Sequence, residues 1–284
     1  MDCKARYYIH VLGTAQDGGY PHLGCNDKCC KSAWENINLH RLPSSIALVD
    51  KLENKFWLFD ATPKIREQLH LMSDIDLSGI FLTHAHYGHY TGLLELGKEV
   101  LNAYNVPVYA MPEMFDFITR NSPFDLLIKN GNILLNKIVD NKVVLDDGKL
   151  IECFEVKHRN ELSETVGYRI KVNDKSIIYL PDLDHYRGFV DVIKELIKNN
   201  NIIFLDGTFY DKKEIKKRDV NKIPHPEIVE SMSLFSKLND SEKKKIHFIH
   251  FNHTNPTIDI KSHEAKNVIE NGFLLSEDNQ IFNL

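Results

Sequence analysis

The sequence predicts a layered α/β fold, in which helices pack against the faces of β-sheets. Two observations support this prediction. Short apolar segments of strand length recur along the chain, and amphipathic segments with helical spacing separate many of them. The chain has 284 residues, of which 43% are hydrophobic, so it can bury a sizeable core as one large domain or two small ones.

The first half of the chain is dominated by strand-like segments. Each is short, apolar and bounded by polar or turn-forming residues, as expected for buried strands. The expected strands here are Tyr7–Leu12, Ser45–Val49, Phe56–Phe59 and Ile80–Leu82. Helical spacing of apolar residues predicts helices at Lys64–Met72, Thr91–Ala103 and Pro112–Asn121. The least regular stretch is 121–144, where we expect an insertion.

The second half repeats this rhythm of short apolar segments and helical patterns. The expected strands are Leu150–Val156, Thr165–Val172, Ser176–Leu180, Ile202–Leu205, Ile246–Ile249 and Gln280–Leu284. The expected helices are Gly188–Lys198, Pro226–Leu238 and Ser262–Glu270. Many strands with interspersed helices are typical of a layered arrangement, in which sheets are covered by helices.

The composition excludes several classes of partner. A formal net charge of −5 provides no basic footprint for nucleic acid or an anionic membrane surface. No stretch approaches the roughly 18 apolar residues of a transmembrane helix, and the N-terminal residues lack the apolar region of a signal peptide. We therefore expect a cytoplasmic protein that acts on a small molecule, without nucleic acid or membrane partners. A homodimer is compatible with the sequence.

Three histidines follow the expected strand at Ile80–Leu82, and they are His84, His86 and His89. Residues just past the carboxyl end of a strand can converge on a cleft, and imidazole is the commonest protein ligand for zinc and similar metals. His84 and His86 lie two apart in extended chain and point the same way, so both can reach one ion. This spacing predicts a metal site.

The five cysteines do not suggest a disulfide framework in a chain of this size. Three of them, Cys25, Cys29 and Cys30, crowd one loop that is rich in Gly, His and Asp. In a reducing cytosol such a group more often binds metal than forms a disulfide, but it supplies at most three ligands. A fourth ligand must come from elsewhere in the chain.

The segment from His84 to His89 resembles the His-x-His-x-Asp-His signature of the metallo-β-lactamase superfamily, with Gly88 in place of the Asp. This resemblance implies a four-layer αβ/βα sandwich (the metallo-β-lactamase fold), formed by residues 1–284 as a single domain with a metal cleft between its halves. It also implies that His84 and His86 bind a first metal and His89 a second. Because Gly88 lacks the anionic ligand, we expect weaker binding of the second metal, and an Asp restored at position 88 should strengthen it.

The same resemblance supplies the remaining candidates, each of which ends an apolar segment. It implies that His158 is the third histidine of the first metal, Asp182 the carboxylate that can bridge both metals, and His250 the last histidine of the second. Asp60 matches an acidic residue that family members carry after an early strand, and it could accept a hydrogen bond from a ligand histidine. Two further histidines have some claim to the cleft, His185 and His225.

Two branches of the superfamily look closer than the β-lactamases. The segment from Val11 to Cys25, Asp206-Gly-Thr-Phe, and the segment from His250 to Pro256 resemble the pyrroloquinoline-quinone biosynthesis B proteins. The full histidine string is more similar to that of the phosphoribosyl cyclic phosphodiesterases. The latter resemblance implies a structural zinc bound by cysteines of the early loop and by His253. Whether Cys29, Cys30 or both take part stays open, because the cysteine spacing departs from the usual pattern.

These residues predict a metal-dependent hydrolase acting on an ester or a phosphodiester-type small molecule. A cation held by the three histidines of the first metal would lower the pKa of a bound water and polarise the scissile group. Asp182 would orient that water and serve as base, while His89 and His250 would bind a second, weaker ion or contact the substrate. The nitrogen-rich ligands favour zinc, with one or two ions in the cleft besides the structural one, although iron or manganese also fits the cleft.

Two alternatives remain open. Three histidines and one carboxylate with open positions also suit non-heme iron oxygen chemistry, which the resemblance to cofactor-biosynthesis proteins allows. Gly88 keeps a non-catalytic protein that binds metal or a cofactor intermediate in consideration. Metal content would separate the first alternative from hydrolysis, and turnover of generic phosphodiester or ester substrates would argue against the second.

Overall fold

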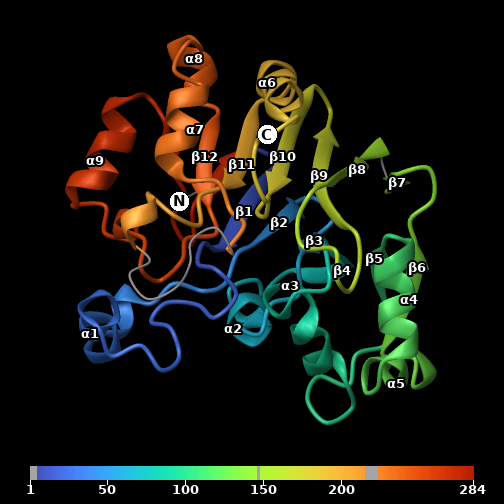
Figure 1. The fold of residues 1–284 in the computed structure, drawn as a ribbon. Coiled ribbons are helices and arrows are strands. Elements are labelled where there is room, and N and C mark those ends of the chain that lie inside the picture. Colours follow the sequence, from blue (N-terminus) through green and yellow to red (C-terminus); the bar gives the residue numbers. More distant parts are fainter. Residues whose placement is uncertain (1–4, 146–147, 215–222) are drawn as a thin grey trace.

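The computed structural model describes residues 5–145, 148–214 and 223–284. In this part of the chain, two mixed seven-stranded sheets face each other, and helices cover their outer faces (Figure 1). Helices α2, α4 and α5 lie on one side of the pair of sheets, and α6, α7 and α9 lie on the other. This is the four-layer sandwich that the sequence predicts.

The first sheet has the strand order β14-β1-β2-β3-β4-β5-β6. Strands β3 to β6 pair in parallel, whereas β14, β1 and β2 pair antiparallel. Its strands are β1 (Tyr7–Gly13), β2 (Ser45–Asp50), β3 (Lys55–Phe59), β4 (Asp76–Phe81), β5 (Val106–Ala110), β6 (Ile133–Lys137) and β14 (Ile281–Asn283).

The second sheet has the strand order β13-β12-β11-β10-β9-β8-β7. Strands β10 to β13 pair in parallel, and β7 to β10 pair antiparallel. Its strands are β7 (Lys142–Val144), β8 (Leu150–Val156), β9 (Thr165–Val172), β10 (Lys175–Leu180), β11 (Ile202–Asp206), β12 (Ile246–Ile249) and β13 (Leu274–Leu275).

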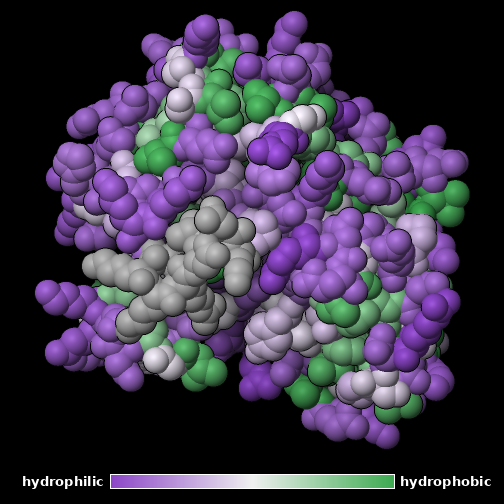
Figure 2. All heavy atoms as spheres, viewed as in Figure 1, coloured by the Kyte–Doolittle hydropathy of each residue, from purple (hydrophilic) through white to green (hydrophobic). Residues whose placement is uncertain are grey.

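The helices are short, and none in the described ranges is long and apolar enough to cross a membrane. The α-helices are α1 (Lys28–Glu35), α2 (Ile65–His70), α3 (Tyr87–Tyr90), α4 (Pro112–Arg120), α5 (Phe124–Lys129), α6 (Val190–Asn199), α7 (Ile228–Leu234), α8 (Asp240–Lys243) and α9 (His263–Glu270). The 3-10 helices are η1 (Ile37–Leu39), η2 (Thr91–Leu96), η4 (Lys212–Glu214) and η6 (Pro256–Ile258). On the face seen in Figure 2, hydrophilic side chains predominate and apolar ones form small groups.

Three apolar layers hold the sandwich together, because successive side chains of a strand point to opposite faces of its sheet. In β3, Phe59 joins the core between the two sheets, while Leu58 packs against the helices outside the first sheet. In β10, Tyr179 joins the same central core, while Leu180 packs toward the outer helices of the second sheet. Both faces of these strands are therefore buried, which explains why they read as continuous apolar runs.

Two expectations for the middle of the chain are wrong. The predicted helix at Thr91–Ala103 is replaced by η2, which ends at Leu96, and Gly97 continues in extended backbone at ψ 167°. The stretch 121–144 is not an insertion outside the fold, because it contains α5 and because β6 and β7 are edge strands of the two main sheets. The dipeptide Ser122-Pro123 separates α4 from α5, and β6 is an edge strand with polar residues, so neither α5 nor β6 has a strong periodic signal.

The carboxyl ends of the parallel strands bring the candidate residues together. Strands β3 and β4 of the first sheet and β10, β11 and β12 of the second run toward the same edge of the sandwich. The residues at or just past these ends are Asp60, His84, Asp182, Asp206 and His250. Parallel strands end at a common edge, so residues distant in sequence meet in one place.

Candidate metal centre

The first group of ligand-type atoms consists of the side chains of His84, His86 and His158, and we call it the first position. His84 Nε2 lies 2.8 Å from His86 Nδ1, and His158 Nε2 lies 3.2 Å from the same atom. Nitrogens bound tetrahedrally to zinc at about 2.0–2.1 Å lie about 3.3 Å apart. The three rings therefore point toward one centre at a spacing close to that of a tetrahedral metal site, as the sequence predicts.

The second group lies beside it and contains His89, His250 and the carboxylate of Asp17, and we call it the second position. Asp17 Oδ1 lies 3.3 Å from His89 Nε2 and 3.5 Å from His250 Nε2. The two histidine rings are stacked with their centroids 5.5 Å apart. His89 lies in the turn of α3 that follows β4, and His250 follows β12, so the second position joins the two sheets.

Asp182 lies between the two positions and turns one oxygen toward each. Its Oδ1 lies 3.6 Å from His158 Nε2, and its Oδ2 lies 3.2 Å from His89 Nε2 and 3.6 Å from His250 Nε2. This is the arrangement expected of a carboxylate that can bridge two metals. The six predicted cleft residues are thus brought together: His84, His86, His89, His158, Asp182 and His250.

A further layer of contacts orients the histidines. His89 Nδ1 lies 2.7 Å from Asp60 Oδ2, and Asp60 also accepts hydrogen bonds from the amide and hydroxyl groups of Thr83 at 2.8 and 2.9 Å. Asp60 is fully buried, so its negative charge depends on these donors. The sequence predicts this supporting role for Asp60, and the structure gives it the geometry for that role.

The backbone is strained where two of these residues enter the cleft. Asp60 has φ 68° and His250 has φ 67°, and both lie in the left-handed region that non-glycine residues seldom adopt. Each follows directly after a strand of the core, β3 or β12. Such strain persists only where the surrounding structure imposes it, and it is common at functional sites.

The electrostatics of the first position disfavour protons. Burial, followed by the positive potential of neighbouring His89, holds the pKa of His84 well below its usual value. Burial and the neighbouring His158 lower the pKa of His86 to about 4. Both imidazoles are therefore neutral near pH 7, which is the state that binds a metal ion.

The electrostatics of the second position favour a positive charge. Burial opposes a charge on His89, but the carboxylates of Asp60 and Asp182 outweigh it and hold the pKa of His89 well above its usual value. Burial likewise opposes charge on Asp182, yet the nearby histidines, His250 foremost, hold its pKa well below the usual range. Several carboxylates thus surround these rings, and the local field favours a positive charge between them.

The donor atoms in both positions fit a metal. At the second position, His89 Nε2, His250 Nε2 and Asp182 Oδ2 are buried and have no hydrogen-bond partner among the described residues. At the first position, the atom of His86 that faces the other two rings is Nδ1. Buried polar atoms without partners are costly in a folded protein, and an ion that they ligate would satisfy them. Imidazole nitrogens with carboxylate oxygens suit zinc, and they also suit iron or manganese.

Asp17 was missed by sequence reasoning, and it bears on the expectation for position 88. A Cβ on Gly88 would lie 2.6 Å from the Cα and 2.7 Å from the Cγ of Asp17. The expectation that an Asp at position 88 would strengthen the second metal conflicts with this contact, because Asp17 occupies the space that its side chain needs. The sequence offered one signal for Asp17 as a ligand: an acidic residue follows the first strand, and the motif lacks its carboxylate at Gly88.

Of the two further histidines, only His225 reaches the cleft. Its Nδ1 lies 2.8 Å from Asp206 Oδ2, and its ring centroid lies 5.1 Å from that of His158. Burial opposes a charge on His225, but Asp206 outweighs it and raises its pKa. His185 is exposed and belongs to none of the clusters found in the described residues.

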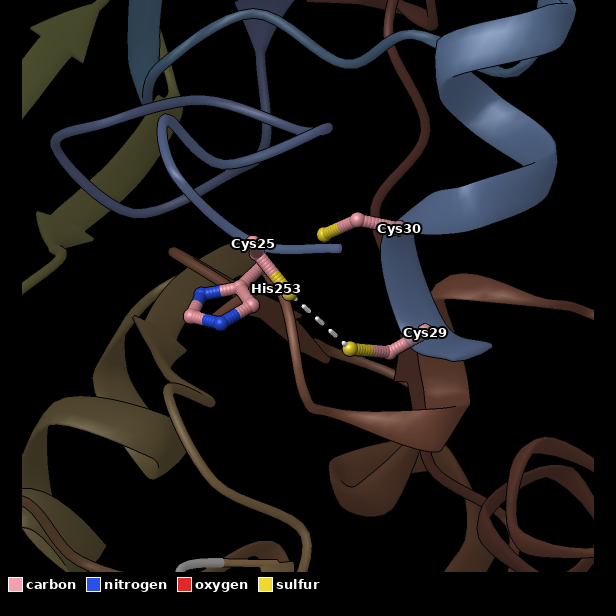
Figure 3. A group of neighbouring side chains, drawn as sticks. All are labelled: Cys25, Cys29, Cys30 and His253. Atoms are coloured by element: carbon pink, nitrogen blue, oxygen red, sulfur yellow. Dashed lines mark hydrogen bonds between the residues drawn. The ribbon is translucent and has the colours of Figure 1, made fainter. Parts of the chain in front are cut away.

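The cysteine–histidine cluster is a separate group of ligand-type atoms and contains Cys25, Cys29, Cys30 and His253 (Figure 3). One ligand-type atom from each of these residues lies within 4.8 Å of the others, and the sulfurs of Cys25 and Cys29 are 3.6 Å apart. Cys29 and Cys30 belong to the first turn of α1, which the sequence did not predict. Both sulfurs face the cluster, so the geometry allows both Cys29 and Cys30 to take part.

The cluster has the composition of a closed structural zinc site. Burial raises the pKa of Cys29, and it raises the pKa of Cys30 to about 12. Thiols in such surroundings stay protonated unless a cation stabilises the thiolates. Three sulfurs and one imidazole make up the four ligands that a structural zinc requires.

Comparison with known proteins identifies the family. Residues 57–251 match the family described as "Beta-lactamase superfamily domain", and this range spans more than half of the chain and contains every predicted cleft ligand. The chain therefore belongs to the β-lactamase superfamily. The resemblance predicted from the histidine motif is confirmed.

Individual relatives cover nearly the whole chain. It is 23% identical over 299 residues to a coenzyme PQQ synthesis protein B of Methylorubrum extorquens, covering 95% of this chain and 98% of the relative. The fold is similar to that of Zn(2+)-bound PqqB from Methylobacterium extorquens, with a TM-score of 0.82, 22% identity, and coverage of 98% of this chain and 100% of that one. It is also similar to a diphosphatase from the PhnP family, with a TM-score of 0.69, 22% identity, and coverage of 97% and 96%.

Proposed function

We propose that the chain is a metal-dependent hydrolase that cleaves an ester or phosphodiester bond in a small molecule. The observation that carries this proposal is the position of Asp182, which turns one carboxylate oxygen toward each of two histidine groups. A metal ion bound there would lower the pKa of a water molecule and polarise the scissile group. The superfamily membership and the similarity to a PhnP-family diphosphatase support this reading.

The residues of the cleft have separable roles in this proposal. His84, His86 and His158 would hold the first ion, and His89 and His250 would hold the second. Asp182, which the neighbouring histidines keep in its charged form, would orient the attacking water between the two positions, and the metal would lower the pKa of that water so that its proton could pass to solvent.

His225 is the group that we assign to the leaving oxygen. It is buried and paired with Asp206 at 2.8 Å, and this carboxylate outweighs burial and raises its pKa, which favours the protonated ring. The ring lies beside His158 without being needed at either metal position. A proton donated from this ring would neutralise the charge that develops on the departing oxygen.

An anionic small molecule fits the surroundings of the cleft. The guanidinium of Arg159 reaches His86 Nδ1 at 3.4 Å and places a positive charge at the edge of the first position. An open pocket of about 790 Å³ lies beside Asp17, and its walls include Lys213 and Asn252. A volume of this size suits a small ligand. Asp27 and Glu214 line the pocket together with Lys28 and Lys213, so the positive charge that favours an anionic group is that of Arg159.

The proposal is tested with purified protein loaded with Zn²⁺, Mn²⁺ or Fe²⁺ in separate preparations. Bis(p-nitrophenyl) phosphate and p-nitrophenyl acetate are the probes, and the release of p-nitrophenol is measured. We expect turnover by the parent protein, loss of it in His86→Ala, and retention in His185→Ala, a matched histidine variant outside the cleft. Absence of turnover on both probes with all three metals would contradict the proposal.

One observation favours a second function. The chain matches the coenzyme PQQ synthesis proteins along nearly its whole length, and its similarity to the PqqB structure exceeds that to the diphosphatase. Three histidines and a carboxylate also suit iron in oxygen chemistry. Turnover that requires iron and consumes oxygen would favour this second function, whereas turnover with zinc and without oxygen favours hydrolysis.

A further inference from the structure

Asp17 lies on the loop that follows β1, and nothing in the motif around His84 points to it. Its Oδ1 is nevertheless 3.3 Å from His89 Nε2 and 3.5 Å from His250 Nε2. We propose that Asp17 is a metal ligand of the second position and that it supplies, from a distant part of the chain, the carboxylate that Gly88 lacks. This inference rests on the proposed function, because it assumes that the second position holds an ion.

The space around Gly88 supports the inference that the carboxylate of Asp17 takes the place of one at position 88. A side chain at position 88 would meet the Cα of Asp17 at 2.6 Å and its Cγ at 2.7 Å, distances that real Cβ atoms do not adopt. The carboxylate of Asp17 itself lies against this same point. The chain can therefore present an acid from position 17 or from position 88 in this fold, but not from both.

Backbone hydrogen bonds fix the loop that carries Asp17. The amide of Gln16 donates to the carbonyl of Phe251 at 2.8 Å, and the amide of Phe251 donates to the carbonyl of Thr14 at 2.8 Å. Phe251 directly follows His250, so the residues before Asp17 are held against the segment that carries a second-position histidine. A quarter of the Asp17 side chain is exposed, which leaves its carboxylate in contact with the open pocket.

Hydrogen bonds at Nδ1 of His89 and His250 determine that, in the neutral rings, the nitrogen facing Asp17 carries no proton. The hydroxyl of Thr208 donates its one hydrogen to Asp206 Oδ1 at 2.7 Å, so it accepts from His250 Nδ1 at 2.9 Å. Asp60 accepts from His89 Nδ1 at 2.7 Å. In the neutral form of each ring, Nε2 therefore carries a lone pair and points into the second position.

Four acceptor atoms consequently face one another across a small space. They are the Nε2 atoms of His89 and His250 and one carboxylate oxygen each of Asp17 and Asp182. Lone pairs and negative charges at such distances repel, and a cation between them removes the repulsion. Two nitrogens and two carboxylate oxygens would supply the four ligands of a tetrahedral zinc ion, or four of the six that an octahedral manganese ion takes.

A proton offers the competing arrangement. In it, His89 carries a charge and pairs with Asp17 and Asp182, and the second position holds no metal. The two arrangements differ in the number of ions in the cleft and in the effect of removing the Asp17 charge. Both differences can be measured without turnover.

The test measures metal binding by the full-length protein and by Asp17→Asn, which keeps the size of the side chain and removes its charge. Asp17→Ala serves as a second variant, and Glu161→Gln is the matched control. Glu161 lies 3.4 Å from His86 Nε2, so this control removes one negative charge beside the first position only. The readouts are ions per chain, isothermal titration with Mn²⁺, and the electron paramagnetic resonance spectrum of the Mn²⁺-loaded protein. Charge-transfer absorption of Co²⁺-loaded protein counts the thiolate-bound ion separately.

We expect the parent to bind two cleft ions with an exchange-coupled Mn²⁺ spectrum. Glu161→Gln should keep the parent affinity at the second position, because Glu161 contacts His86 of the first position. Asp17→Asn should bind the second ion about tenfold or more weakly and show the spectrum of an isolated ion. Two ions at parent affinity in both Asp17 variants would overturn the inference, and so would a single cleft ion in the parent. If the parent binds one cleft ion and still turns over the probes, the hydrolase proposal stands and the inference about Asp17 fails. If the parent binds two ions but is inactive, and Asp17→Asn loses the second ion, the inference about Asp17 stands and the hydrolase proposal fails.

Discussion

Asp17 and Gly88 share one place in the structure, because the Cα of Asp17 lies 2.6 Å from where a Cβ of residue 88 would be. The two residues are far apart in the sequence and meet only where the loop after β1 crosses α3. A departure from a local motif therefore does not by itself show that a ligand is missing. In this chain another segment fills the same space with a carboxylate.

The first prediction follows from that contact. Gly88→Asp should lower the free energy of unfolding by about 1–3 kcal/mol, the usual cost of forcing extra atoms into a packed site, and should not tighten binding of a second ion. Urea unfolding and zinc titration measure the two effects. Gly88→Ala is the control, since its Cβ meets the same backbone atom and should lower stability without adding a charge. A stable Gly88→Asp protein with tighter zinc binding would contradict this prediction.

The second prediction separates the two metal positions. His86→Ala should lose the ion of the first position, because the Nδ1 atom of His86 lies within 3.2 Å of both partner nitrogens. His250→Ala should lose only the ion of the second position and leave one ion in the cleft. Metal analysis of each purified variant, with His185→Ala as the control, measures the difference. Full occupancy of the cleft in His86→Ala would show that the assignment of this histidine is wrong.

Much of the fold and site could be predicted from the sequence, because the strands of the sandwich are buried on both faces. Segments such as Ile177 to Leu180 have side chains in two apolar layers, which leaves a strong local signal. The candidate ligands follow such strands, so each could be located at a strand end. Asp17 also follows a strand, but its function depends on the space left at Gly88, and that contact has no signature in either segment alone.

The failed helix at Thr91–Ala103 has a different cause. Its apolar residues have helical spacing, yet the chain buries only part of them. Leu93 and Leu96 are buried by a 3-10 helix that ends at Leu96, whereas Leu94, Val100 and Leu101 are exposed. The amide of Gly97 bonds to the carbonyl of Leu94, and Asn102 adopts φ 48°, so the chain turns back toward β5. Tertiary packing decided the local conformation here, and spacing alone could not show it.

The third prediction concerns the cysteine–histidine cluster. Cys25→Ser should remove about one zinc ion per chain and lower the melting temperature, because a structural ion contributes folding free energy directly. The same loop carries Asp17, so binding at the second position should weaken as well. Cys153→Ser is the control, since Cys153 is buried elsewhere and its loss should lower stability without loss of zinc. Unchanged zinc content and melting temperature in Cys25→Ser would exclude a metal in this cluster.

The fourth prediction is a pH dependence of stability that arises from His247 in β12. This side chain is 6% exposed, packs at 4.8 Å against the ring of Phe282, and has no hydrogen-bond partner at Nδ1 among the described residues. Burial lowers its pKa to about 4, compared with about 6.5 in the unfolded chain. The folded protein therefore keeps His247 neutral over a range of pH in which the unfolded chain binds a proton there.

The sign follows from this difference in proton binding. Above about pH 6.5, His247 is unprotonated in both the folded and the unfolded state, so it leaves stability unchanged. As the pH falls toward about 4, the unfolded state binds a proton there and the free energy of unfolding decreases, by a total of about 3 kcal/mol. His247→Phe should remove this contribution, because it fills the apolar site without a titratable group. Urea unfolding of the two proteins across this range, with the same metal loading, measures it. The stability difference between His247→Phe and the parent should shift in favour of the variant as the pH falls, and a constant difference would show that His247 is not held neutral by burial.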